Sequence, residues 1–192
     1  SWGVSTRIIG GIIMTHGDDS GLVLPPAVAP IQAVVIPIQQ QKAGVLDAAK
    51  NITATLKAAG IRVKLDDSEQ SPGWKFSEYE MKGVPLRVEI GPRDLAENKC
   101  VIVRRDNRQK TFVSLDDLVP AVRQGLADLL AAIYQKALDN RERRTYDAHT
   151  LDELVKIAGE KSGYIRAMWC GDRACEDKLK EVADVTSRCI PF

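Results

Sequence analysis

The stretch Pro72–Arg105, PGWKFSEYEMKGVPLRVEIGPRDLAENKCVIVRR, decides how the rest of the chain is interpreted. Residues 86–90 alternate apolar and charged side chains, which predicts a strand with one buried face and a second face that carries Arg87 and Glu89. A second strand is predicted at 100–105, after a Gly-Pro turn. Aromatic side chains beside arginine and glutamate suit stacking on unpaired RNA bases. A solvated charged rim of a sheet explains the same pattern, and this stretch alone favours that simpler interpretation.

The composition is that of an ordinary globular protein. The 192 residues are 44% hydrophobic and 28% charged, and the net charge of +1 neither indicates nor excludes a nucleic-acid partner. No apolar run approaches the roughly 20 residues that cross a bilayer, and no secretion signal opens the chain, so we expect a cytoplasmic location. Because Ser1 starts directly in an apolar run and no polar tail follows Phe192, we expect a fragment of a longer protein.

The first thirty residues predict a pair of strands and a linker. Residues 1–16 are rich in Ile and Val and read as two strands, with Arg7 as the single charge inside them. An arginine placed there needs an anionic partner, which is either an internal carboxylate or a ligand phosphate. A short strand is expected at 22–24, and prolines and alanines up to Pro30 indicate a linker.

The middle of the chain predicts an α/β domain. A buried-type strand, an amphipathic helix and a further strand form a β-α-β unit with a parallel crossover. A capping pattern at Ser114 and Asp117 precedes a long helix, which has Pro120 in its first turns. The resulting fold class is a mixed sheet flanked by helices. The predicted strands are 32–38, 61–65, 86–90, 100–105 and 111–114, and the predicted helices are 45–59, 75–81 and 115–137.

The last part of the chain predicts a small α+β unit. Thr150 and Glu153 form a capping box, and we expect a helix to about residue 159. Further elements are expected as a strand at 164–169, a helix ending near residue 185 and a final strand at 187–190.

Cysteine spacing gives the one candidate metal site. Cys170 and Cys175 are separated by four residues in a Gly-containing turn, which could place two thiolates on one Zn²⁺. Two ordinary thiols are an equally good explanation, because a second cysteine pair is missing from the sequence. The two histidines, His16 and His149, do not assemble into a convincing catalytic set.

Taken together, these residues resemble the prolyl-tRNA synthetases of the archaeal and eukaryote-like type, over nearly the whole chain. The resemblance rests on several separated blocks: Ser1-Trp2-Gly3-Val4-Ser5-Thr6-Arg7, His16-Gly17-Asp18-Asp19, Leu24-Pro25-Pro26, Met81-Lys82-Gly83-Val84-Pro85, Gly91-Pro92-Arg93-Asp94, Trp169-Cys170-Gly171 and Cys189-Ile190-Pro191-Phe192.

The resemblance implies three parts. Residues 1–30 would be the end of a class II catalytic domain with its motif 3, residues 31–140 an anticodon-binding domain, and residues 141–192 a truncated zinc-binding-like C-terminal domain. Motif 3 would place Ser5 and Arg7 on ATP, and Trp2 and Gly3 in the proline and adenylate pocket. Because motifs 1 and 2 are absent, we expect no catalytic residue here and no proline activation by this chain alone.

The resemblance also implies a set of residues that reads the guanines of the proline anticodon. Phe76 would stack on a base, Glu80 would accept from guanine N–H groups, and Arg87 and Arg93 would donate to O6 and N7. The parent enzyme would be a proline–tRNA ligase that uses ATP and Mg²⁺ and works as a homodimer on proline tRNA, without a membrane or DNA partner. Two of its zinc ligands would be Cys170 and Cys175, while Cys189 matches no ligand.

Three alternatives stay open at the level of sequence. The chain could be a stand-alone RNA- or protein-binding adaptor, the tail of a histidyl-, glycyl- or threonyl-tRNA synthetase, or a structural dimerisation fragment. The Trp169-Cys170-Gly171 block favours the prolyl enzyme over the other synthetases, and an adaptor gives no reason for Arg7 in its strand.

Overall fold

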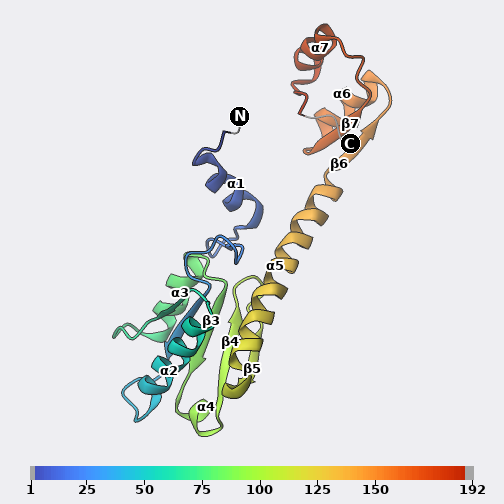
Figure 1. The fold of residues 1–192 in the computed structure, drawn as a ribbon. Helices are drawn as coiled ribbons and strands as arrows, with labels where there is room; N and C mark the ends of the chain where they lie inside the picture. Colours follow the sequence, from blue (N-terminus) through green and yellow to red (C-terminus); the bar gives the residue numbers. More distant parts are fainter. Residues whose placement is uncertain (1–2, 189–192) are drawn as a thin grey trace. The chain divides into compact units, whose positions relative to one another are not determined.

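The computed structural model describes residues 3–188 of the chain (Figure 1). The chain divides into two compact units, Ser1–Gln135 and Lys136–Phe192. The first contains a five-stranded sheet and the second a two-stranded sheet. None of the helices in the described residues is long and apolar enough to cross a membrane.

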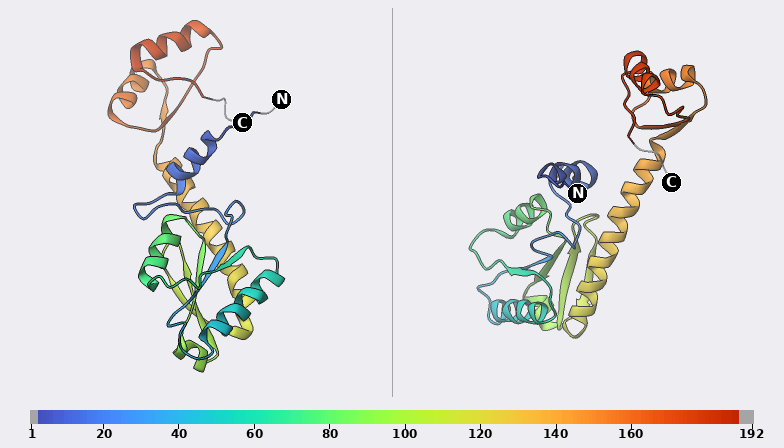
Figure 2. Two further views of the ribbon diagram at one scale, coloured as in Figure 1. Left: turned by 90° about the vertical axis from the view of Figure 1, so that its left-hand side faces the viewer. Right: turned by 45° about the horizontal axis from the view of Figure 1, so that its top comes forward.

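The sheet of the first unit is mixed, as predicted. Its strand order is β2-β1-β3-β4-β5, with β1 parallel to both neighbours and the later pairs antiparallel. Figure 2 shows the helices packed on both sides of this sheet. Every predicted strand between residues 32 and 114 is confirmed, with these bounds: β1 Ala33–Pro37, β2 Val63–Leu65, β3 Leu86–Ile90, β4 Lys99–Arg104 and β5 Lys110–Ser114.

Two helices cover one face of the sheet and a third helix covers part of the other. The main core packs α2 (Val45–Ala58) and α5 (Leu118–Arg143) against inward side chains of the sheet such as Val88. On the opposite face, α3 (Pro72–Met81) packs Tyr79 on β1. Since α3 shares its face with the charged side of β3, that side is sheltered rather than a free rim.

Local signals explain where the helices begin. The Ser71 hydroxyl accepts a hydrogen bond from the Trp74 amide, so α3 starts at Pro72 and not at residue 75. The Ser114 hydroxyl accepts from Asp116 instead of Asp117 and opens a 3₁₀ turn, η1 (Leu115–Asp117), ahead of α5. A short 3₁₀ piece therefore precedes α5, and Pro120 is tolerated in the first turn of α5. The predicted turn after Gly91 is a short helix, α4 (Pro92–Ala96).

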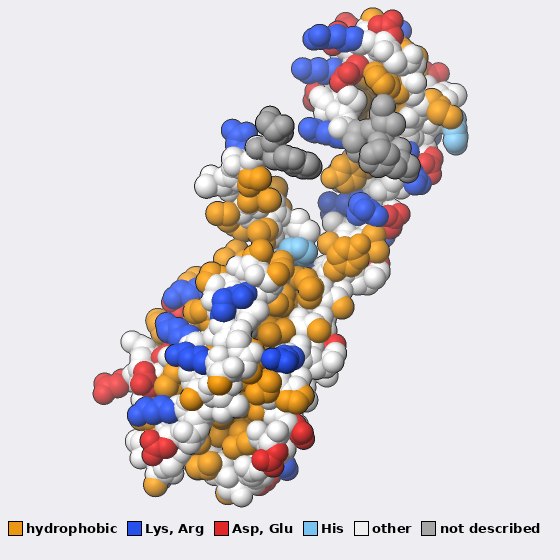
Figure 3. Space-filling model, in the orientation of Figure 1, with side chains coloured by type: hydrophobic (Ala, Val, Ile, Leu, Met, Phe, Trp, Pro, Cys, Tyr) orange, Lys and Arg blue, Asp and Glu red, His pale blue; other side chains and the backbone are white. Residues whose placement is uncertain are grey.

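The predicted strand pair at residues 1–16 is wrong. Residues Arg7–His16 form a helix, α1, and the segment 22–24 is bound through backbone hydrogen bonds without being a strand. Helical spacing of the isoleucines outweighed their β-branched preference for strands. No residue of α1 is buried, and Met14 is among its exposed hydrophobic residues. Hydrophobic side chains gather on the surface of this helix (Figure 3).

In its described residues, the second unit contains the end of α5, a pair of parallel strands and two further helices. The Thr150 hydroxyl accepts from the Glu153 amide, which confirms this cap. The predicted strand at 164–169 is confirmed in part, whereas Ser187 and Arg188 are not a strand and the rest of that predicted strand lies outside the described residues. The elements are β6 Thr145–Ala148, α6 Leu151–Glu160, β7 Tyr164–Ala167 and α7 Arg173–Ala183.

Candidate nucleic-acid interface

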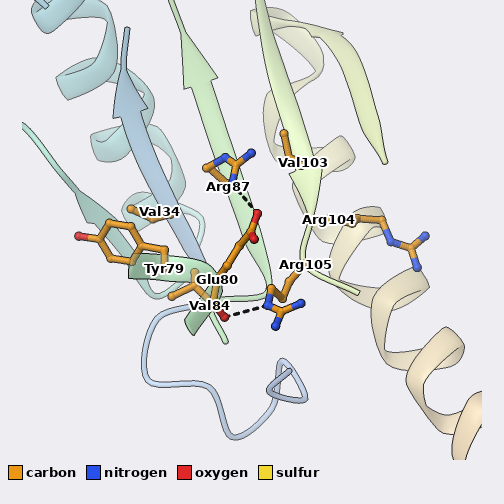
Figure 4. Close-up of a pocket in the computed structure, with 8 residues that line it drawn as sticks. All are labelled: Val34, Tyr79, Glu80, Val84, Arg87, Val103, Arg104 and Arg105. Carbon is orange, nitrogen blue, oxygen red and sulfur yellow. Dashed lines mark hydrogen bonds and ion pairs between the residues drawn. The ribbon is translucent and has the colours of Figure 1, made fainter. Parts of the chain in front are cut away.

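A small pocket lies where the end of α3 meets β3 and β4 (Figure 4). Its lining includes an aromatic residue, a glutamate, arginines and valines, and the guanidinium of Arg104 points away from it (Figure 4). Two side chains of the anticodon set inferred from the family resemblance, Glu80 and Arg87, line it. The full lining is Val34, Tyr79, Glu80, Val84, Arg87, Val103, Arg104 and Arg105.

Three of the expected anticodon residues meet in one cluster. The guanidinium of Arg87 stacks on the Phe76 ring, 3.8 Å from its centroid. Arg87 Nη1 donates to Glu80 Oε1 at 3.3 Å, and Arg87 Nε donates to Glu89 Oε1 at 2.7 Å. Phe76 and Glu80 stand one helical turn apart on α3, while Arg87 and Glu89 stand two residues apart on β3, so all four side chains converge.

This cluster is sheltered from water. Only 11% of the Arg87 and Glu89 side chains is exposed, compared with 23% of Glu80. Charge pairs in such places are held firmly, because loss of one partner leaves the other charge buried and uncompensated. Glu80 is therefore the carboxylate of the cluster that is most accessible to a ligand.

The fourth expected residue lies elsewhere in the same unit. Arg93 is exposed in α4, just beyond the carboxyl end of β3. The Asp94 carboxylate accepts from the Gly91 amide at 2.8 Å and fixes the start of this short helix. The structure therefore brings Phe76, Glu80 and Arg87 together and leaves Arg93 on a neighbouring element.

A second charged contact escaped the sequence analysis. The side chain of Arg105 is 2% exposed, and it donates to both carboxylate oxygens of Asp18, at 2.8 and 2.6 Å. The hydrogen bond from Arg105 lowers the pKa of Asp18 to about 2. The signal that could have found this pair was an arginine at the end of a buried strand, which requires a carboxylate partner.

A buried lysine was missed as well. Lys75 is 2% exposed and donates to the backbone carbonyls of Asp66, at 2.9 Å, and Ser68, at 2.8 Å. Its Nζ also lies 3.5 Å from the Asp66 carboxylate. Burial alone would raise the pKa of Asp66, but hydrogen bonds from Ser68 and the charge of Lys75 lower it. Burial of the Tyr79 hydroxyl, together with the negative charge of Asp66, raises the pKa of Tyr79 to about 12.

The residues expected to contact ATP and proline lie at the start of the described chain. Gly3, Ser5 and Arg7 are all exposed, and Trp2 lies outside the described residues. Arg7 begins a helix, so the prediction that it lies inside an apolar strand is wrong. Its assignment to ATP remains an inference from the family resemblance.

The two cysteines of the candidate zinc site are brought together. A hydrogen bond from Cys175 lowers the pKa of Cys170, and the same contact raises the pKa of Cys175. Both thiols are exposed at the start of α7, where Asp172 caps the helix. Within residues 3–188, however, no group of three or more His, Cys, Asp or Glu side chains could hold a metal ion. The described donor set does not fit a complete tetrahedral site.

Comparison with known families covers both units. Residues 32–125 match the family model of an anticodon-binding domain, and residues 151–192 match that of the prolyl-tRNA synthetase C-terminal region. The first match contains the whole Phe76–Arg87 cluster.

Individual relatives match over the full chain. The chain is 58% identical to a proline–tRNA ligase of Lachnospira eligens and 56% identical to those of Clostridium botulinum strain 657 and Ruminiclostridium cellulolyticum. Each match covers 100% of this chain and 40% of the relative, so the chain spans about two fifths of their length.

Proposed function

Since this chain belongs to the C-terminal region of the prolyl-tRNA synthetase family, we propose that it is part of a proline–tRNA ligase and supplies recognition of the proline anticodon. The parent enzyme would activate proline with ATP to prolyl-adenylate and transfer it to proline tRNA. The observation that carries the proposal is the cluster of Phe76, Glu80 and Arg87 inside the anticodon-binding domain.

The cluster supplies the chemistry that guanine requires. The Watson–Crick edge of guanine presents N–H donors, which a carboxylate accepts, and an O6 acceptor, which a guanidinium satisfies. Glu80 is the accessible carboxylate, and Arg87 fixes its orientation through the 3.3 Å bond. Arg87 has five N–H donors, and its bonds to Glu80 and Glu89 use two of them. A splayed base would stack on the Phe76–Arg87 pair.

A titration tests this function. The purified 192-residue chain is titrated with a proline-tRNA anticodon stem-loop and with one whose anticodon guanines are replaced. We expect the replacement to weaken binding at least tenfold, because each good base contact contributes about 1–3 kcal/mol of discrimination. Equal binding of the two RNAs would rule out guanine recognition.

Substitution of Glu80 locates the effect within the cluster. Glu80→Gln keeps the shape of the side chain and replaces one acceptor oxygen with a donor, so discrimination should fall while general RNA affinity stays. Glu97→Gln is the matched control, since Glu97 is a 64% exposed carboxylate of the same domain that pairs with Lys99. An equal loss in both variants would assign the effect to overall charge.

The remaining parts of the proposal concern the ends of the chain. Residues 1–30 would complete a class II catalytic domain, with Ser5 and Arg7 near ATP and its Mg²⁺ and with Trp2 and Gly3 near proline. Residues 31–140 would form the anticodon-binding domain and residues 141–192 the C-terminal domain. A homodimer and a cytoplasmic location belong to the same proposal, because the parent enzyme would serve protein synthesis.

The zinc-binding character of the C-terminal domain is also part of the proposal. Cys170 and Cys175 would hold half of a zinc site, and zinc there would supply structural cross-linking of the unit. No step of the proposed function runs through this metal, because the described residues do not supply the other ligands.

A further inference from the structure

Two arginines at the β4–β5 turn contact both the end of α3 and the segment 17–24. We propose that Arg105 and Arg108 form a clamp, with Asp18, Ser20 and Glu80 as its partners, that couples base recognition at Glu80 to the position of the segment 17–24. These five residues are called the turn clamp. The inference rests on the proposed function, because it makes Glu80 the shared residue of base reading and clamping.

The first arm of the clamp is Arg105. Its Nη1 and Nη2 bind the Asp18 carboxylate in a fork, and its Nε donates to the Glu80 backbone carbonyl at 2.8 Å. All three guanidinium nitrogens are thereby engaged in one plane. A lysine at this position would keep the charge and lose the fork. Arg105 therefore fixes the backbone of Glu80, from which the proposed recognition side chain extends.

The second arm is Arg108. Its Nη2 donates to the Ser20 hydroxyl and lies 3.5 Å from Glu80 Oε2. Arg108 adopts a left-handed backbone conformation with φ of 57°, and its amide donates to the Arg104 carbonyl at 2.9 Å. A non-glycine residue in this conformation is uncommon and is held by its surroundings. From this turn the side chain reaches both Glu80 and Ser20 of the segment 17–24.

The segment itself fits the end of α3 in a single register. Leu22 donates its amide to the Met81 carbonyl at 3.0 Å, and Leu24 donates to the Gly83 carbonyl at 3.3 Å. A Cβ on Gly21 would lie 2.5 Å from the Met81 Cα, and one on Gly83 would lie 2.6 Å from the Leu22 Cβ. With so little space between them, the two backbones cannot slide past each other, so displacement of one displaces the other.

These contacts make the coupling positive. The clamp holds the end of α3 in place before a base arrives, so less conformational entropy is lost when Glu80 is engaged. By linkage, a base bound at Glu80 must stabilise the clamp by the same free energy. The segment 17–24 follows α1 directly, so occupancy of the anticodon site is transmitted to the part of the chain that resembles the catalytic domain.

The free chain provides the first test, through hydrogen exchange of the Leu22 and Leu24 amides. Asp18→Asn should accelerate both amides about tenfold, and Arg105→Lys should give a smaller acceleration because it retains the charge. Asp106→Asn is the matched control. It weakens an equally forked pair with Arg104, 2.8 and 3.0 Å long, on the same turn and should leave these two amides unchanged. Unchanged exchange in Asp18→Asn would overturn the clamp.

The bound chain provides the second test. Addition of the stem-loop should slow exchange of both amides in the unaltered chain, and Asp18→Asn should lower affinity about fivefold, mainly as lost guanine discrimination. If the unaltered chain binds the RNA and the Asp18→Asn and Arg105→Lys variants still discriminate guanines as well as it does, the coupling alone would be overturned. Failure of the unaltered chain to distinguish guanines would overturn the proposed function and the coupling together, whatever the free chain shows.

Discussion

At the residue scale, β3 shows what alternation reveals and what it hides. The pattern places Arg87 and Glu89 on the face opposite the core, and they are there, but only 11% of each side chain is exposed. The pattern could not reveal this shelter, because it comes from contacts of Arg87 with Phe76 and Glu80 of α3, which form only in the folded chain. The contact of Arg105 with Asp18 depends in the same way on residues far apart in sequence.

Lys75 offers a stability test at this scale. Lys75→Met removes the donor that serves the Asp66 and Ser68 carbonyls and leaves the buried Asp66 carboxylate without its cationic partner. We expect a loss of about 3–5 kcal/mol in the free energy of unfolding, measured by urea denaturation. Lys82→Met is the control, since Lys82 is 52% exposed in its pair with Glu78 and should cost less than about 1 kcal/mol. Similar losses in both variants would contradict a structural role for the buried pair.

Asp18 predicts a pH dependence. Its folded-state pKa is lowered from 3.8 to about 2, so its contribution is present above pH 3.8 and is lost as the pH falls through 2. The unaltered chain should therefore be more stable than Asp18→Asn at pH 6, and the difference should shrink steadily between pH 4 and pH 2. Urea midpoints measured across this range give the comparison. A difference that stays constant down to pH 2 would show that the carboxylate charge is not responsible.

At the element scale, periodicity predicted all five strands of the sheet and the helices α2 and α5. These elements combine strong alternation or helical spacing with deep burial. The prediction failed at α1, where the isoleucine-rich composition suggested strands. Because no residue of α1 is buried, no burial pattern distinguishes a helical period from a strand period there. The prediction also placed the start of α3 three residues late, because the capping role of Ser71 was not recognised.

The cap of α3 gives a test at this scale. Ser71→Ala removes the hydroxyl that accepts from the Trp74 amide and should destabilise the domain by about 1 kcal/mol, measured by thermal or urea unfolding. Ser77→Ala, at an exposed position inside the same helix, should be neutral or slightly stabilising. If Ser71→Ala were as mild as Ser77→Ala, the cap would contribute little to the start of α3.

At the scale of the whole chain, the sequence predicted the family through separated blocks, and two domain matches confirm it. Of the proposed anticodon set, three residues form one cluster while Arg93 lies on α4. The blocks could not predict this grouping because they record residue identity without orientation. The spacing of Cys170 and Cys175 likewise predicts that the two thiols meet but does not predict further metal ligands, and none joins them among the described residues.

Catalytic activity gives the test at this scale. We expect the purified 192-residue chain to show no proline-dependent ATP–pyrophosphate exchange, because it matches only 40% of the length of the related ligases and the family resemblance places class II motifs 1 and 2 outside it. The full-length ligase of a relative, assayed in parallel, serves as the positive control. Exchange above the background of a proline-free reaction would show that the chain activates proline without those motifs.

The position of β1 has a consequence for the order in which the domain folds. Ala33 pairs with Val63 on one side and with Leu86 on the other, so β1 is completed only when distant segments meet. The strands β3, β4 and β5 pair with sequence neighbours and close shorter loops. Substitutions in the β3–β5 meander should therefore slow refolding, whereas substitutions in β1 should mainly speed unfolding. The β-strand side of the proposed RNA-reading surface would then be ordered early, before β1 is in place.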